Sequence, residues 1–186
     1  MLQIPPIPSW DAMHPLIIHF PIALLLLSPL FILISAILTP SKSRPYFAAG
    51  LMVLLLGTAG LYLAASTGEA AAELAEQGNI AKSVLSTHEH LASETKVIFS
   101  VLSIVLLGMF FVPRILHRQE TRVTSTYLPA AFLVLYAVGV LPLVNTAHAG
   151  GRLVHEFGVH AQVAPAAGEQ ALPPTAASKE EKADED

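Results

Sequence analysis

Histidine is the residue type in this chain that is best suited to hold a cofactor. The 186 residues include eight histidines and no cysteine. A neutral imidazole is a ligand for haem iron and for divalent zinc, copper or nickel. The lack of cysteine excludes disulfides, thiolate metal sites, iron–sulfur clusters and covalently attached haem. Any cofactor must therefore be held by histidine, methionine, carboxylates or backbone groups.

Four long apolar segments are the elements that must position these histidines. Hydrophobic residues make up 53% of the chain and charged residues 13%, about half the charge of an average soluble domain. A helix needs about 20 apolar residues to cross the roughly 30 Å of hydrocarbon in a bilayer. Segments of this kind run over residues 15–38, 46–67, 97–114 and 127–147. Because backbone groups inside lipid must bond to one another, we expect an all-α integral membrane protein, a four-helix transmembrane bundle.

Basic residues orient the predicted bundle. The two short connections, after the first and third segments, carry Lys42, Arg44, Arg114, Arg118 and Arg122. The connection between the second and third segments carries mainly acidic residues, which are Glu69, Glu73, Glu76, Glu89 and Glu94. Cytoplasmic loops of membrane proteins are enriched in Lys and Arg. The short connections are therefore predicted to be cytoplasmic, and both termini to face the periplasm across a bacterial inner membrane.

The chain outside the four segments divides into an outer helical part and a tail. Residues 69–77 are rich in the helix formers Ala and Glu. Gly78-Asn79 is typical of a helix stop and a new start, so the third helix is predicted to begin near Ile80 and to stand above the bilayer. The composition of residues 163–186 predicts a disordered acidic tail. Residues 1–162 are predicted to form one domain that contacts the lipid bilayer and binds no nucleic acid.

This topology gathers seven of the eight histidines at the outer face. They come from three helices: His14 and His19 from the first, His88 and His90 from the third, and His148, His155 and His160 at or after the end of the fourth. Ionisable residues at membrane depth usually face a bundle interior, a partner or a cavity. The convergence predicts a site for an imidazole-bound group at the outer end of the bundle.

Glycines and one arginine accompany the histidines. Gly150-Gly151 is predicted to end the fourth helix, because glycine allows backbone conformations that other residues avoid. Arg152 is predicted to pair with Glu69 or Glu73, or with a haem propionate. The second helix carries a stripe of small residues that suits either close helix packing or a slot for a flat cofactor; it consists of Gly50, Gly57 and Ala64.

Four short motifs lie at the predicted outer ends of the helices. They are HPLIIHFPIALLLL at 14–27, TGEAAAELAE at 67–76, THEHLA at 87–92 and HAGGRLVHEFGV at 148–159. Together they resemble a bacterial membrane family called domain of unknown function 2231, over roughly residues 10–160. The resemblance implies four helices, with His14, His19, Thr67-Gly68, His88-Glu89 and Gly150-Gly151 at characteristic positions. Similar proteins have Tyr in place of His155, and some occur beside cytochrome-like modules, which implies a redox role.

The first functional hypothesis is a membrane-embedded b-type cytochrome that transfers electrons. Non-covalent haem needs two axial imidazoles from facing helices, an apolar slot, and polar partners for its propionates. The candidates are His14 or His19 for one ligand and His88 or His148 for the other, with Arg152 and His155 close to the haem edge. Such a protein is expected to be a redox carrier, or a subunit that works with other cytochromes or respiratory-complex subunits, rather than a stand-alone enzyme.

Two further hypotheses stay open. A divalent metal site would combine imidazoles with carboxylates, and its candidate ligands are His19, His88, His148, Glu69, Glu73 and Glu89. A structural subunit of a membrane complex would instead use its histidines only to bond neighbouring carbonyls. No nucleophile motif of a hydrolytic enzyme is present in the sequence.

Overall fold

The computed structural model describes residues 7–77, 82–117 and 121–159. Within these ranges the chain forms helices and no strand. The elements are α1 (His14–Ile17), α2 (His19–Ile37), α3 (Pro40–Gln77), α4 (Lys82–Ile115), the π-helical turn η1 (Val123–Tyr127) and α5 (Leu128–His155). Four runs are long and apolar enough to cross a membrane: His14–Ile37, Pro40–Glu73, Lys82–Ile115 and Val123–His155. The predicted all-α fold with four membrane-spanning helices is confirmed.

Prolines explain where the first two spans start and stop. α1 and α2 form one span that is interrupted only at Ile18, near Pro21, whose missing N–H leaves the preceding turn one hydrogen bond short. Leu38 leaves the helical conformation with a ψ of 161°. Pro40 then starts α3, at the first helical position where its fixed φ is favourable.

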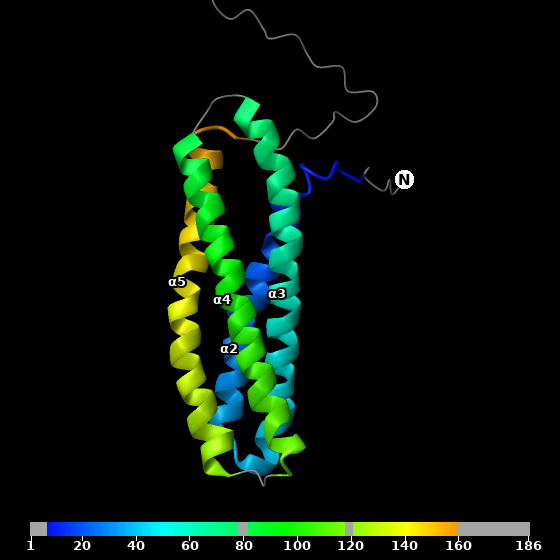
Figure 1. The fold of residues 1–186 in the computed structure, drawn as a ribbon, viewed down its shortest axis with the longest axis vertical. Coiled ribbons are helices and arrows are strands. Elements are labelled where there is room, and N and C mark those ends of the chain that lie inside the picture. The colour runs from blue at the N-terminus through cyan, green and yellow to red at the C-terminus, as the bar shows by residue number, and fades with distance from the viewer. Residues whose placement is uncertain (1–6, 78–81, 118–120, 160–186) are drawn as a thin grey trace, which may run out of the picture.

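The helices are longer than the apolar segments predict. α3 continues to Gln77 and α4 begins at Lys82, so both extend beyond the apolar segments 46–67 and 97–114. These extensions lie at the upper end of the bundle in Figure 1. The expected outer helical segment is therefore present. The predicted stop at Gly78-Asn79, the residue His160 and the predicted tail lie outside the described residues.

The predicted end of the fourth helix at Gly150-Gly151 is wrong. α5 runs through both glycines to His155, and neither glycine has a positive φ. The last turn of α5 buries Leu153 in a small apolar cluster with Ala72 and Val84. Burial of this kind outweighs the helix cost of a glycine, which is about 1 kcal/mol.

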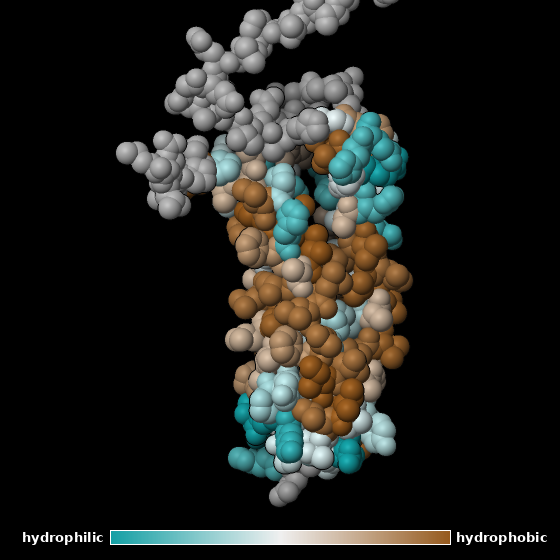
Figure 2. Space-filling model, turned by 180° about the vertical axis from the view of Figure 1, so that it is seen from behind, coloured by the Kyte–Doolittle hydropathy of each residue, from teal (hydrophilic) through white to brown (hydrophobic). Residues whose placement is uncertain are grey.

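The helices form a four-membered bundle (Figure 1). α2 packs on α3 and α4 on α5, and these two hairpins meet through α3 with α4 and through α2 with α5. α2 and α4 are therefore diagonally opposite. The central core is built from Leu25, Ile32, Leu54, Phe99, Leu106 and Tyr136. Figure 2 shows a hydrophobic belt around the middle and hydrophilic ends, as expected for a protein surrounded by lipid.

The stripe of small residues on α3 serves helix packing along most of its length. A Cβ added to Gly50 would lie 2.8 Å from Cγ1 of Ile32, and one added to Gly57 would lie 2.8 Å from Cδ2 of Leu25. The side chains of α2 therefore fill the space that these glycines leave. Of the two interpretations of the stripe, the structure supports close packing at Gly50 and Gly57.

The two hairpins are equivalent halves of the molecule. We call α1–α3 the first hairpin and α4–α5 the second hairpin. Each residue of the first helix in one hairpin has an equivalent a fixed number of positions later in the sequence, in the first helix of the other hairpin. Equivalent residues have the same burial class, as in His14 and His88, Leu25 and Phe99, and Ile32 and Leu106. The same holds for their second helices: Ser43 and Ser125, Gly57 and Gly139, Gly68 and Gly150. The helix contacts follow the same relation, so the halves are related by a pseudo-twofold axis along the bundle.

Candidate functional site

His14, at the start of α1, lies with its ring against α3. Its Nδ1 is 2.9 Å from the carbonyl oxygen of Ala64 and 3.2 Å from the hydroxyl oxygen of Thr67. A carbonyl can only accept a hydrogen bond, so Nδ1 carries the ring proton. Gly68 makes room for the ring, because a Cβ at this position would lie 2.9 Å from Cε1 of His14. The ring is therefore held by backbone groups of a neighbouring helix.

His88 repeats this arrangement in the second hairpin. Its Nδ1 donates to the carbonyl of Thr146 at 3.0 Å. A Cβ on Gly150 would lie 3.1 Å from Cε1 of His88. The Thr146 hydroxyl donates to the carbonyl of Pro142 at 2.7 Å and lies 3.1 Å from the hydroxyl of the buried Thr95. α5 thus positions His88 in the way that α3 positions His14.

Both rings present the same nitrogen for binding. With the proton on Nδ1, a neutral imidazole has its lone pair on Nε2, the form that ligates metals and haem iron. Among the described residues neither Nε2 has a hydrogen-bond partner, and neither is completely buried. His14 and His88 belong to the same layer, because each ring lies beside a glycine at the equivalent position of its own hairpin. The pair is therefore suited to bind one group from two sides.

The two imidazoles lie in a layer of small and hydroxyl-bearing residues. We call this the histidine layer; it consists of His14, Thr67, Gly68, His88, Thr146 and Gly150. The main core packs below it. One helical turn above it, a second apolar cluster contains Ala72, Val84, Leu85 and Leu153. The layer is therefore a polar site between two apolar regions.

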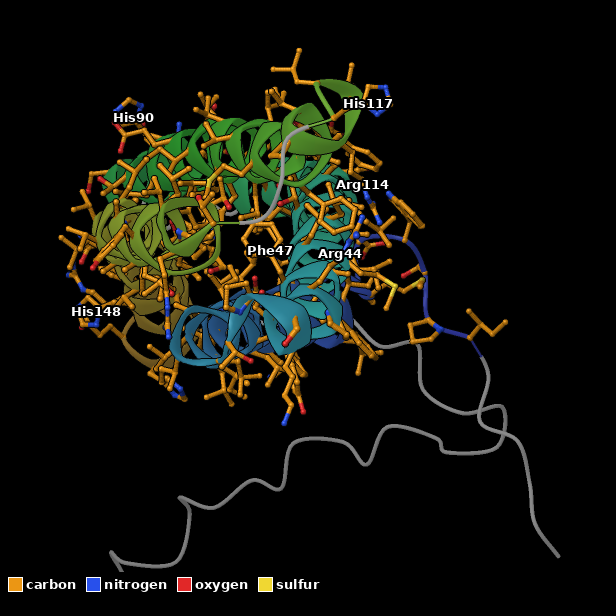
Figure 3. The ribbon with its side chains drawn as sticks, turned by 90° about the horizontal axis from the view of Figure 1, so that it is seen from below. Arg44, Phe47, His90, Arg114, His117 and His148 are labelled. Carbon is orange, nitrogen blue, oxygen red and sulfur yellow. The ribbon has the colours of Figure 1, made fainter. Side chains whose placement is uncertain are left out.

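The other described histidines do not face this layer. His19, His90, His117, His148 and His155 are exposed, and Figure 3 shows His90 and His148 on the outside of the ring of helices. His90 pairs with Glu94 one turn further on, at 3.2 Å. His19 is five positions from His14, which rotates it by roughly 140° around the helix. Of the predicted ligand set, the structure places His14 and His88 in the histidine layer and leaves His19, His148 and His155 outside.

Arg152 pairs with a partner that the sequence did not indicate. Its Nε lies 2.9 Å from Oε2 of Glu156, and Nη2 is also 2.9 Å from that oxygen. This contact replaces the expected pairing with Glu69 or Glu73. The guanidinium of Arg152 lowers the pKa of the exposed Glu156 carboxyl by its hydrogen bond. An exposed pair within one helix contributes little to stability.

The predicted carboxylate ligands lie on the surface. Glu69, Glu73 and Glu89 are all exposed. In the part of the chain that the structure describes, no group of three or more His, Asp or Glu side chains is arranged to hold a metal ion. The histidine layer thus offers two imidazole ligands and no carboxylate.

The sequence motifs include Gly68 and Gly150, and the stripe of small residues includes Ala64, but neither pattern indicated that these residues position the two rings. Gly68 and Gly150 are the recesses for the two rings, and Ala64 and Thr146 supply the accepting carbonyls. Each carbonyl lies one helical turn before its glycine. An internal comparison of the two halves was the available signal, because it aligns the histidines and the glycines at the same time.

Comparison with known proteins assigns the chain to a family. A family model described as "Predicted membrane protein (DUF2231)" matches residues 11–163, which include all four spans and the histidine layer. No curated protein and no solved structure matches. The match agrees with the resemblance of the four motifs. The chain therefore belongs to the family of predicted membrane proteins DUF2231.

Proposed function

We propose that this protein binds one b-type haem between His14 and His88 and transfers single electrons. One observation carries the proposal. Two imidazoles from diagonally opposite helices have the same tautomer, the same kind of backbone acceptor and the same kind of glycine recess. Bundles commonly build cofactor sites from side chains on facing helices in this way.

Haem suits the ligand set better than a bare divalent metal. Two axial imidazoles complete the coordination of haem iron, because the porphyrin supplies the remaining ligands. Zinc sites commonly take three or more protein side chains, and the described residues offer no such cluster. The apolar regions on both sides of the histidine layer suit the faces and edges of a porphyrin. When bound, the haem iron supplies one-electron exchange.

The protein's own residues fix the ligands before any haem arrives. The carbonyls of Ala64 and Thr146 hold the proton on Nδ1 and raise the basicity of Nε2. Gly68 and Gly150 let each ring lie close to the neighbouring helix. Since these groups belong to long helices, the site is rigid, as precise ligand placement requires.

The rest of the core supports a single haem. In the described chain the buried polar residues are all serines and threonines; they are Ser28, Ser35, Ser43, Thr58, Thr67, Thr95, Ser103 and Ser125. No second pair of imidazoles faces the interior of this part. With the orientation expected from the basic loops, the haem would lie near the periplasmic face. Its electron partners would be other cytochromes or subunits of a respiratory complex.

Absorption spectroscopy of the purified protein tests this function. We expect a Soret band, and on reduction the sharp alpha band of six-coordinate haem b. His14→Ala and His88→Ala should each lose most of the bound haem, because each removes one axial ligand. His19→Ala and His148→Ala, at exposed positions, should keep the spectrum.

Two results would contradict the haem proposal. One is a Soret band that survives in both His14→Ala and His88→Ala. The other is a folded, haem-supplied protein without the band. Stoichiometric metal without porphyrin, lost in the same two variants, would replace the haem by a metal ion at this site.

A further inference from the structure

A groove on the outside of the second hairpin combines a polar end with an apolar wall. It has a volume of about 630 Å³ and runs between α4 and α5. Its polar residues are His90, Ser93, Glu94 and Asn145, and its apolar wall includes Val97, Ile98, Val138, Leu141 and Pro142. Asn145 is exposed and has no hydrogen-bond partner among the described residues. Its amide therefore has a donor and an acceptor available to a molecule that enters the groove.

The first hairpin shows what this surface looks like when it only faces lipid. The pseudo-twofold axis relates His90 to Leu16, Glu94 to Phe20 and Asn145 to Leu63. All three of these equivalents are exposed hydrophobic residues. The one polar side chain of that surface is His19, at the place of Ser93. At equal depth in the bundle, the groove of the second hairpin therefore has four polar side chains where the first hairpin has one.

The charges of the groove select the kind of head group. Nε2 of His90 lies 3.2 Å from a carboxylate oxygen of Glu94, so the polar end has no excess positive charge whether or not His90 is protonated. The nearby Lys96 turns away, with its Nζ 5.6 Å from the centre of the Tyr62 ring on α3. A phosphate head group would find no free cation here. A neutral ring with hydroxyl or carbonyl groups would find an acceptor in Glu94 and a donor in Asn145.

We propose that this groove binds the ring of a membrane quinol, with its isoprenoid tail along Val97, Val138 and Leu141. The groove and the part of the histidine layer around His88 are formed by the same two helices, α4 and α5. Leu91 lines the groove one turn after His88, and Asn145 precedes Thr146, whose carbonyl holds His88. The inference deepens the proposed function, since it names the electron donor for the haem.

The reaction balances with the groups already named. Oxidation of one quinol to the quinone releases two electrons and two protons. A haem held by His14 and His88 would accept these electrons one at a time, and it would pass the first to its partner cytochrome or respiratory subunit before it takes the second. The protons pass to the carboxylate of Glu94 and the imidazole of His90, and from there to water at the adjacent end of the bundle.

Equilibrium binding of decyl-ubiquinone to the purified protein in detergent tests the groove. We expect saturable binding with one site per chain. Asn145→Leu and Glu94→Gln should each weaken it by about tenfold, equivalent to ~1.4 kcal/mol, because each removes one polar contact. The control variants Leu63→Ala and Phe20→Leu alter the equivalent positions of the first hairpin and should leave the affinity unchanged. Asn145→Leu places an apolar side chain on a lipid-facing surface, so its fold should be preserved.

The outcomes separate the groove from the haem. Affinities that are equal in wild type and in both groove variants would overturn the inference, as would displacement of the probe by phospholipid bicelles. A haem spectrum without saturable quinone binding would overturn the groove and leave the haem. Saturable binding that is lost in the groove variants of a haem-free protein would support the groove and overturn the electron-transfer function.

Discussion

At the scale of single residues, two glycines determine where the imidazoles lie. A methyl group on Gly68 would lie 2.9 Å from Cε1 of His14, and one on Gly150 would lie 3.1 Å from Cε1 of His88. The ring cannot retreat without stretching the hydrogen bond from Nδ1 to the backbone carbonyl. The size of the residue at these two positions therefore controls where the rings of His14 and His88 lie.

Alanine substitutions test this control. Gly68→Ala should lower the free energy of unfolding by about 1–3 kcal/mol, the usual cost of overpacking, and should reduce haem content. Gly151→Ala is the matched control, because a Cβ at Gly151 meets nothing within 4 Å. It should stabilise the protein by about 0.5–1 kcal/mol, since glycine disfavours a helix interior. Thermal melts and haem absorbance of both variants measure the difference, and identical behaviour would contradict the recess.

At the scale of elements, a proline in α2 creates a bond between helices. Pro29 has no N–H, so the carbonyl of Leu25 lacks its donor one turn later in α2. The hydroxyl of Tyr136 on α5 donates to this carbonyl at 2.6 Å. Polar groups in a membrane interior need such partners. The contact joins the two hairpins below the histidine layer.

A double-mutant cycle measures this link. Tyr136→Phe leaves the Leu25 carbonyl unsatisfied and should cost about 1–3 kcal/mol of stability. In a Pro29→Ala background the helix regains its own N–H donor, so the same substitution should cost clearly less. Tyr62→Phe is the control, because the Tyr62 hydroxyl bonds Ser100 at an exposed position. Additive losses in the cycle would show that Pro29 and Tyr136 act independently.

At the scale of the whole molecule, the arginines of the short connections and the histidine layer lie at opposite ends of the bundle. Arg44 and Arg114 lie at the lower end, which faces the viewer in Figure 3. Arg114 also stacks over the ring of Phe110, 4.6 Å from its centre. The histidine layer lies toward the other end, where α1 begins and α5 finishes. The positive-inside rule therefore predicts that this end faces the periplasm.

Cysteine labelling tests this orientation without background, because the chain has no cysteine of its own. Ser83→Cys and Ser41→Cys introduce one exposed thiol each, at opposite ends of the bundle. In intact spheroplasts a membrane-impermeant maleimide should label Ser83→Cys, and Ser41→Cys only after lysis. The reverse pattern would place the histidine layer on the cytoplasmic side.

The sequence alone determined the number of spans and the end at which the histidines gather. Hydropathy is a property of each segment by itself, because it measures the transfer of its residues from water to lipid. The four spans therefore did not depend on how the helices pack. The longer α3 and α4 were also predictable, since helix-forming residues continue past the apolar segments.

Only the tertiary structure decided which histidines face the interior of the bundle. The rotation of each helix about its axis depends on contacts with its neighbours, which hydropathy does not contain. These contacts direct His14 and His88 inward and leave His19 and His148 outside. The burial of Leu153 likewise carries α5 through Gly150-Gly151, although an isolated pair of glycines favours a helix end. The pairing of Arg152 with Glu156 follows from that same continued helix, because it places the two residues one turn apart.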